Sequence, residues 1–294
     1  MEGRDLGLCP FICGYGIILL MFISGEVNMG KKKRVLIGIC IFLVLVVGYA
    51  TYYLNTYYRS SEEADKFIRS DDQVAVKEIK EGYFFDGPGD DKALIFYPGG
   101  KVETKAYARL MNKLAKEGID TFLLDMPFHL AVLNKNAADK IISKYQYDTY
   151  YMGGHSLGGV MAIDYANDNS EKIDGVFLLA AYPNKKIDGH FNVLSVYGSN
   201  DKVLNMKKYE KAEENYYEQF IDYEKIDEIS SDLFTKKFFK EIVIDGGNHA
   251  SFADYGKQKG DGEATISVEE QVDRTVEEII NYVGELKKLG VGGV

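Results

Sequence analysis

The stretch that most constrains the fold of this chain is residues 148–166, DTYYMGGHSLGGVMAIDYA. It begins with an aromatic run typical of a buried strand, passes through glycines, and continues with the apolar spacing of a helix. Ser156 stands at the bend. A sharp strand-to-helix turn lifts such a hydroxyl clear of the sheet, and Gly154 and Gly158 leave room for a strained backbone. The stretch therefore predicts an accessible, reactive serine.

The pattern of glycines around Ser156 is weak evidence on its own, because this glycine and serine usage produces it by chance in some chains. The alternative is an ordinary turn in which His155 and Ser156 are polar turn residues. His155 fills the variable position of the pattern, where we expect it to shape the packing around a substrate pocket. The weight of the pattern therefore depends on partner residues farther along the chain.

An apolar segment near the N-terminus, residues 35–54, carries no charged side chain. A helix of this length is about 30 Å long at 1.5 Å per residue, which is enough to cross a bilayer. A basic cluster at residues 31–34 precedes the segment, and several tyrosines end it, as is common at membrane interfaces. Because basic flanks stay in the cytoplasm, we expect a single-pass anchor in the cell membrane with the remainder of the chain outside the cytoplasm.

Two alternatives for residues 35–54 are a buried core helix and a signal peptide cleaved near Gly48-Tyr49-Ala50. The upstream residues 6–24 are also uncharged, and they are either a first membrane span or an untranslated leader, since Met29 is a second candidate start. We expect four parts in the chain: a leader with the basic cluster (1–34), a transmembrane helix (35–54), a spacer that holds the domain off the membrane (55–72) and a globular domain (73–294).

Length and composition suit one large α/β domain with an appendage, because the chain has 294 residues, 46% of them hydrophobic and 27% charged. The formal net charge of −10 argues against nucleic acid as a partner. Cys9, Cys13 and Cys40 all precede the globular part, which therefore has no thiol nucleophile or metal–thiolate site. The sequence indicates no metal and no organic cofactor, and it leaves the oligomeric state open.

Short apolar runs alternate with amphipathic segments along residues 73–294, which predicts a mostly parallel sheet with helices on both faces. Besides the run before Ser156, an initial strand or hairpin is expected at 74–85, and strands are expected at 93–97, 119–124, 176–180, 192–197 and 241–244. Helices are expected after Ser156, near 105–117 and 136–144, in a long stretch before residue 241, and at 268–289.

Two further residues fall where a serine nucleophile needs an acid and a base. Asp201 follows one expected strand, and His249 follows the last one. In an open α/β sheet the loops at the carboxyl ends of the strands share one edge, so we expect Ser156, Asp201 and His249 to converge there. The alternatives are a turn or cap role for Asp201, with Asp188 as the acid, and an ordinary loop role for His249.

Four short motifs stand out: FYPGGKVE (96–103), DMPFHLAV (125–132), GHSLGG (154–159) and GNHASFADYG (247–256). Together they resemble those of the α/β-hydrolases, in particular the dienelactone-hydrolase-like branch, often found in bacteria behind a membrane anchor. The resemblance implies an α/β-hydrolase fold with Ser156 as nucleophile, His249 as general base and Asp201 as the acid that orients it. The resemblance covers residues 93 to 271 and indicates almost nothing about the substrate.

The segment 206–239 departs from the family pattern, because it is longer, rich in Tyr, Glu and Lys, and free of proline. Its aromatic residues either form a lid over an apolar substrate or pack onto their own domain. The residues concerned are Tyr209, Tyr216, Tyr217, Phe220 and Tyr223.

The reaction expected from this reasoning is hydrolysis of a small-molecule carboxylic ester through an acyl-serine. The oxyanion is expected between the N–H of Leu157 and that of Gly100 or Lys101, and His129 is expected at the rim of the substrate pocket. Two other kinds of protein would have a similar sequence pattern: a catalytically inactive binding protein tethered to the membrane, and an acyltransferase.

Overall fold

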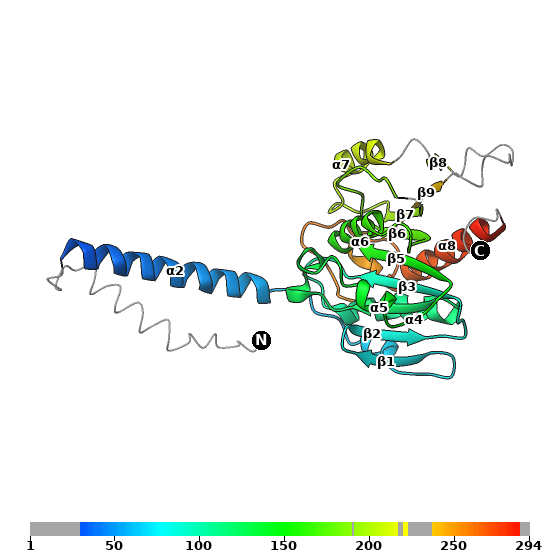
Figure 1. The fold of residues 1–294 in the computed structure, drawn as a ribbon, viewed down its shortest axis with the longest axis horizontal. Helices are drawn as coiled ribbons and strands as arrows, with labels where there is room; N and C mark the ends of the chain where they lie inside the picture. Colours follow the sequence, from blue (N-terminus) through cyan, green and yellow to red (C-terminus); the bar gives the residue numbers. More distant parts are fainter. Residues whose placement is uncertain (1–29, 190, 217–219, 223–236, 289–294) are drawn as a thin grey trace. The chain divides into compact units, whose positions relative to one another are not determined.

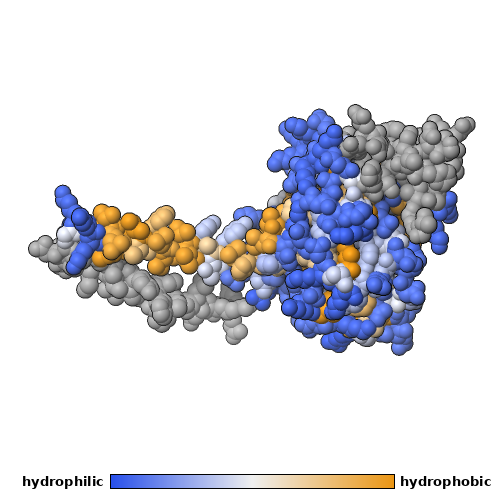
Figure 2. Space-filling view, viewed as in Figure 1, coloured by the Kyte–Doolittle hydropathy of each residue, from blue (hydrophilic) through white to orange (hydrophobic). Residues whose placement is uncertain are grey.

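A computed structural model describes residues 30–189, 191–216, 220–222 and 237–288. The chain forms two compact units, residues 1–55 and 56–294. The described part of the first unit is one helix, α2 (Lys31–Asn55), which has no buried residue. Its length and composition are sufficient to cross a membrane, and Figure 2 shows apolar residues along the middle of its visible face. The apolar helix expected at 35–54 is therefore present, while a cleaved signal sequence would pass the same test.

In the second unit the described residues form a nine-stranded sheet in the order β1-β2-β4-β3-β5-β6-β7-β9-β8 (Figure 1). The hairpin β1-β2 joins β4 in antiparallel fashion, and every other pair of neighbours is parallel. The strands are β1 (Ala75–Ile79), β2 (Gly82–Asp86), β3 (Lys92–Tyr97), β4 (Asp120–Leu124), β5 (Thr149–His155), β6 (Gly175–Leu179), β7 (Asn192–Gly198), β8 (Phe220–Asp222) and β9 (Lys237–Ile244).

Helices cover both faces of this sheet, as the alternation of apolar runs predicts. The helices are α3 (Ala64–Phe67), α4 (Ala108–Lys116), α5 (Asp139–Ile142), α6 (Leu157–Asp168), α7 (Met206–Lys211) and α8 (Val268–Lys288), and the 3-10 turns are η1 (Thr104–Tyr107), η2 (Pro127–His129), η3 (Ala131–Leu133), η4 (Ala212–Asn215) and η7 (Ala250–Phe252). The helix expected near 136–144 is thus a single turn, α5.

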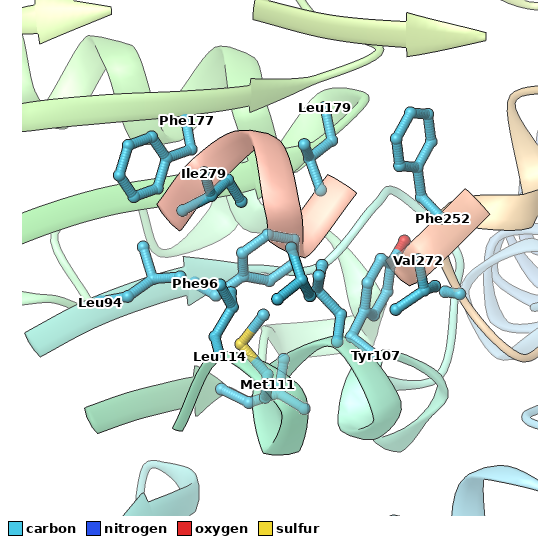
Figure 3. Packing of buried hydrophobic residues seen from close by; sticks show 14 of the residues in the cluster. Leu94, Phe96, Tyr107, Met111, Leu114, Phe177, Leu179, Phe252, Val272 and Ile279 are labelled. Carbon is cyan, nitrogen blue, oxygen red and sulfur yellow. The ribbon is translucent and has the colours of Figure 1, made fainter. Parts of the chain in front are cut away.

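Two hydrophobic cores lie on opposite faces of the sheet because successive side chains of a strand alternate between faces. Leu94 and Phe96 of β3 belong to the core that contains α4 and α8, which Figure 3 shows from close by. Ile95 and Tyr97 belong to the other core, under α5 and α6. Burial on both faces explains why the central strands are continuous apolar runs without polar alternation. The expected α/β class and sheet are confirmed.

The expected long helical stretch between residues 206 and 239 is wrong in its described part. Only α7 and the short turn η4 are helical there, and β8 adds an edge strand beside β9. Tyr209 is 5% exposed and packs on its own domain, and the ring of Tyr216 lies 4.5 Å from that of Phe239. These two contacts match the packing alternative over the lid, while Tyr217 and Tyr223 lie outside the described residues.

The expected spacer at 55–72 is also wrong, because these residues belong to the second compact unit from residue 56 onward. Tyr58 pairs with Val102 in an isolated bridge, and its N–H donates to the Lys101 carbonyl over 2.7 Å. Farther along, the Ser61 N–H donates to the Asp254 carbonyl over 2.7 Å. Residues 56–72 join the second unit through main-chain hydrogen bonds to loops distant in sequence. Hydropathy and charge do not indicate such bonds.

Candidate active site

Ser156 stands between β5 and α6, at the bend that the sequence predicts, with φ 52° and ψ −122°. These angles lie outside the regions that non-glycine residues normally adopt. Two hydrogen bonds hold the turn: the Ser156 N–H donates to the Leu179 carbonyl (2.9 Å), and the Val160 N–H donates to the Ser156 carbonyl (3.1 Å). Backbone strain that the surrounding structure enforces in this way is typical of functional positions.

Glycines on both sides of Ser156 let α6 approach the sheet closely. A Cβ atom at Gly154 would lie 2.5 Å from the main-chain carbon of Gly158, and one at Gly159 would lie 2.5 Å from the Cβ of Ala181. No flexible side chain is available to move aside at Gly154, because its neighbours are main-chain atoms. The glycines therefore fix the position of the serine relative to β5.

Gly158→Ala is expected to lower the free energy of unfolding by about 3 kcal/mol, near the upper end of typical overpacking costs. The new Cβ would lie 2.2 Å from the Tyr97 carbonyl oxygen and 2.3 Å from that of Pro98. Urea unfolding measures the effect. Gly284→Ala is the matched control, because its site in α8 has nothing within 4 Å and the change should stabilise by about 1 kcal/mol. Unchanged stability of the Gly158 variant would contradict the close packing.

Asp201 and His249 form a buried pair, with the carboxylate Oδ2 and the imidazole Nδ1 2.7 Å apart and side chains 1% and 2% exposed. The other carboxylate oxygen, Oδ1, accepts the N–H groups of Val203 and Leu204, each over 2.8 Å. These bonds fix the orientation of the carboxylate toward the ring. The second ring nitrogen, Nε2, is buried and makes no hydrogen bond with Ser156 or with any other described residue.

A second carboxylate, Asp261, ties together the two loops that carry this pair. Its oxygens accept main-chain N–H groups from His249 (3.3 Å), Ala250 (2.9 Å), Lys202 (3.3 Å) and Gly262 (2.8 Å). Lys202 follows Asp201 directly, so one side chain positions both members of the pair. Sequence reasoning placed Asp261 within the resembling region without giving it this role.

His155 lies in the core beside the pair and is 1% exposed. Its ring centroid is 4.5 Å from that of His249, and its Nδ1 is 2.7 Å from the Tyr107 hydroxyl. The Gly99 N–H donates to that hydroxyl over 3.0 Å, so we assign the Tyr107 O–H as donor to Nδ1 of His155. Burial, with the charge of His249 second, lowers the pKa of His155 well below its usual value. This position fits the expected packing role.

Stability is expected to fall as the pH drops below about 6.5, in part through His155. Below that pH the unfolded chain binds a proton at residue 155 that the folded chain excludes, and the slope reaches about 1.4 kcal/mol per pH unit for one such group. Urea unfolding of the wild-type and His155→Gln chains between about pH 5.5 and about pH 7 measures it. The variant should show a smaller pH dependence, and an unchanged slope would contradict the assignment.

The loop after β3 approaches the serine turn from the other side. A Cβ at Gly100 would lie 2.9 Å from Cδ2 of Leu157, so the two residues are in contact. The Lys101 N–H is already committed, since it donates to the His129 carbonyl over 2.7 Å. His129 is half-buried, its ring centroid lies 4.0 Å from that of Tyr57, and burial lowers the pKa of its imidazole. The His129 carbonyl therefore contacts Lys101, and the His129 ring contacts Tyr57.

Asp188, the alternative acid, is exposed, and its N–H donates to the Asn167 side chain over 2.7 Å. The carboxylate that faces His249 belongs to Asp201. The roles of Tyr107 and Asp261 could not be found from the sequence, because their partners lie far away along the chain. Tyr107 does stand one turn before the apolar stripe of α4, which was the only available signal of its burial.

The sequence profile described as the alpha/beta hydrolase family matches residues 93–273, more than half of the chain. The chain belongs to the alpha/beta hydrolase family. The sheet order, the strained serine turn and the Asp201–His249 pair agree with this assignment. The resemblance that the motifs indicated is confirmed at the level of the superfamily. Membership supports hydrolase activity.

Comparison with curated proteins gives no match to the chain. Among solved structures, Est1E from Butyrivibrio proteoclasticus is similar, with 14% identity, coverage of 72% of this chain and 99% of that chain, and a TM-score of 0.47. Alpha/beta hydrolase domain-containing protein 10 from mouse is 12% identical, with coverage of 74% of this chain and 98% of that chain and a TM-score of 0.47. Dienelactone hydrolase from Anabaena variabilis is 12% identical, with coverage of 71% of this chain and 98% of that chain and a TM-score of 0.44.

Proposed function

We propose that this alpha/beta hydrolase cleaves carboxylic esters through an acyl-serine intermediate, with Ser156 as nucleophile, His249 as general base and Asp201 as the acid that orients it. The observation that carries the proposal is the buried Asp201–His249 pair, whose Nε2 has no described partner and whose ring lies against the residue before Ser156. A buried nitrogen without a hydrogen bond needs a reason, and accepting a proton during turnover supplies one. Catalytic hydrogen bonds are often unformed until substrate binds.

In the proposed reaction the Ser156 oxygen attacks the ester carbonyl while Nε2 of His249 takes its proton. The Asp201 carboxylate accepts the Nδ1–H bond and stabilises the imidazolium. The imidazolium then gives the proton to the leaving alcohol, and an acyl-serine remains. His249 next removes a proton from water, which attacks the acyl carbonyl. The bond between the acyl group and the Ser156 oxygen breaks, the imidazolium returns its proton to that oxygen, and the carboxylic acid leaves. The step needs no reactant beyond ester and water.

The oxyanion is proposed to lie between the N–H groups of Leu157 and Gly100. Leu157 begins α6, and the first N–H groups of a helix lack partners within the helix and carry its positive dipole end. Gly100 contacts Leu157, whereas the Lys101 N–H is engaged by the His129 carbonyl. This favours Gly100 over Lys101 as the second donor. Both donors are main-chain groups. Each is expected to stabilise the oxyanion by roughly 3 kcal/mol in the transition state.

We further propose that α2 anchors the enzyme in the cell membrane, with residues 56–294 on the extracytoplasmic side. The support is the uncharged run of residues 35–54 within α2 and the basic cluster 31–34 in the first turn of the same helix. Retention of the full chain in the membrane pellet after carbonate extraction is expected. Release of a protein whose N-terminus begins near Ala50 would instead show cleavage of a signal sequence.

A fluorophosphonate probe, which reacts with activated serines, tests the catalytic proposal. The folded full chain should be labelled at Ser156, as identified by mass spectrometry of the adducted peptide. The Ser143→Ala variant is the control and should label like the wild type, because Ser143 is an exposed serine far from the turn. A folded chain that stays unlabelled at Ser156 would favour a binding protein over an enzyme.

A further inference from the structure

The first residues after α2 run along the rim of the candidate active site. We call residues 56–61 the entry strap. The N–H of Tyr58 donates to the Lys101 carbonyl (2.7 Å), and the Glu103 N–H donates to the Tyr58 carbonyl (2.9 Å). The ring of Tyr57 packs on His129 at 4.0 Å. The strap is therefore fixed to the loops after β3 and β4, at the carboxyl ends of the strands.

The loop after β3 is the one that approaches Ser156. Gly100 contacts Leu157, the residue after the serine, and Lys101 carries the main-chain bonds to both the strap and His129. One loop thus contacts the serine turn on one side and the entry strap on the other. The end of the strap nearest α2 lies at the edge of the site.

Covalent geometry limits how far this edge can lie from the end of α2. Asn55 is the last residue of the helix, and Tyr58 is three residues later. Three residues span at most about 11 Å even when fully extended, whatever angle the helix makes with the domain. The polar headgroup layer of a bilayer is about 5 to 7 Å thick on each side. If α2 crosses the bilayer, the rim therefore stands at headgroup level or just above it.

The same rim carries exposed apolar side chains. Within the described part of the 56–294 unit, four large apolar side chains are exposed, and three of them, Phe128, Val132 and Leu133, lie on the loop that contains His129. They are 52%, 54% and 54% exposed. Contiguous exposed apolar groups mark surfaces that contact a membrane or a partner. This loop is joined to the strap through the Tyr57–His129 contact, so these apolar side chains lie on a loop that binds the first residues after α2.

We propose that the loop 127–133 and the entry strap dock on the bilayer that holds α2, so that the active site receives an ester carried by a membrane-resident amphiphile. The acyl chain would reach Ser156 from the headgroup layer without crossing water. The inference rests on the proposed ester hydrolysis and on α2 as a retained anchor. A second copy of the chain on the same patch is the competing occupant, and the test below separates the two.

Lipid quenching of a site-specific fluorophore tests the docking. The full chain, with its three cysteines changed to alanine, receives one new cysteine by Val132→Cys and a bimane label. It is reconstituted into phosphatidylcholine–phosphatidylglycerol vesicles with or without a doxyl-labelled lipid. Glu117→Cys is the matched control, because Glu117 is exposed where α4 ends, just before the amino end of β4. Position 132 should be quenched at least about threefold more than position 117, as expected for apolar groups buried in the interface.

Equal quenching at the two positions would overturn the docking, and so would an intermolecular disulfide in the unlabelled Val132→Cys chain when the labelled chain shows no lipid quenching. Fluorophosphonate labelling of the same vesicles keeps the two proposals apart. Labelled Ser156 with unquenched position 132 rejects the docking and leaves ester hydrolysis standing. Quenched position 132 with unlabelled Ser156 supports the docking surface and rejects the enzyme.

A rate comparison tests the substrate class. Val132→Ser together with Leu133→Ser should reduce hydrolysis of para-nitrophenyl palmitate embedded in vesicles by about fivefold or more, while para-nitrophenyl butyrate in solution is hydrolysed at nearly the wild-type rate. Both substrates release the same phenol, so the chemical step is matched. An equal effect on both rates would contradict delivery from the bilayer.

Discussion

Ser156→Ala is expected to abolish ester hydrolysis while leaving the fold intact. Removal of the nucleophile from a serine triad typically lowers kcat by roughly a million-fold, and the remaining activity comes from binding and the oxyanion site. The backbone should tolerate the change, because Ala180 of the same chain already adopts φ 49°, close to the 52° of Ser156. The serine hydroxyl makes no described hydrogen bond to His249, so its loss leaves no new unpaired partner there.

Initial rates with para-nitrophenyl butyrate, together with thermal unfolding of the same sample, measure this result. Ser143→Ala serves as the control for an exposed serine and should keep the full rate. A Ser156 variant that hydrolyses the ester at a rate near that of the wild type would remove the nucleophile assignment. A variant with a much lower melting temperature would show that the turn also depends on the hydroxyl.

The elements that carry the site could be predicted because their signals are local. The buried strand before Ser156, the glycines at the turn and the helix after it occupy one stretch of sequence. The pairing of Asp201 with His249 was predictable from topology, since parallel strands present their carboxyl ends at one edge. The structure places these two side chains 2.7 Å apart although 48 positions separate them.

The features that could not be predicted depend on contacts without a local pattern. Residues 56–61 resemble a polar spacer in composition, yet their N–H groups bond to loops far along the chain. Lys101 and His129, which the Lys101 N–H bond joins, both have positive φ angles (63° and 58°) that neither residue type indicates. The segment after residue 206 has aromatic residues at helical spacing, but α7 ends at Lys211.

Asp201→Asn is expected to lower kcat by roughly ten thousand-fold, about 5.5 kcal/mol in the barrier, through the tautomer of His249. The carboxylate oxygen Oδ1 accepts the N–H groups of Val203 and Leu204, so an asparagine side chain would keep its oxygen there. Its NH₂ group would then face Nδ1 of the imidazole, which must become an acceptor. The proton would move to Nε2, and Nε2 could no longer take the proton of Ser156.

Burst kinetics and steady-state rates with para-nitrophenyl butyrate separate this effect from lost binding, because a wrong tautomer slows acylation at unchanged substrate affinity. Asp188→Asn is the control, since Asp188 is an exposed carboxylate, and its rate should equal that of the wild type. Fluorophosphonate labelling of Ser156 should slow in parallel with the Asp201 variant's ester rate, because both reactions need the same base. An Asp201 variant with normal rate and normal labelling would show that Nε2 is kept free of its proton by some other group, and the buried pair would then be structural.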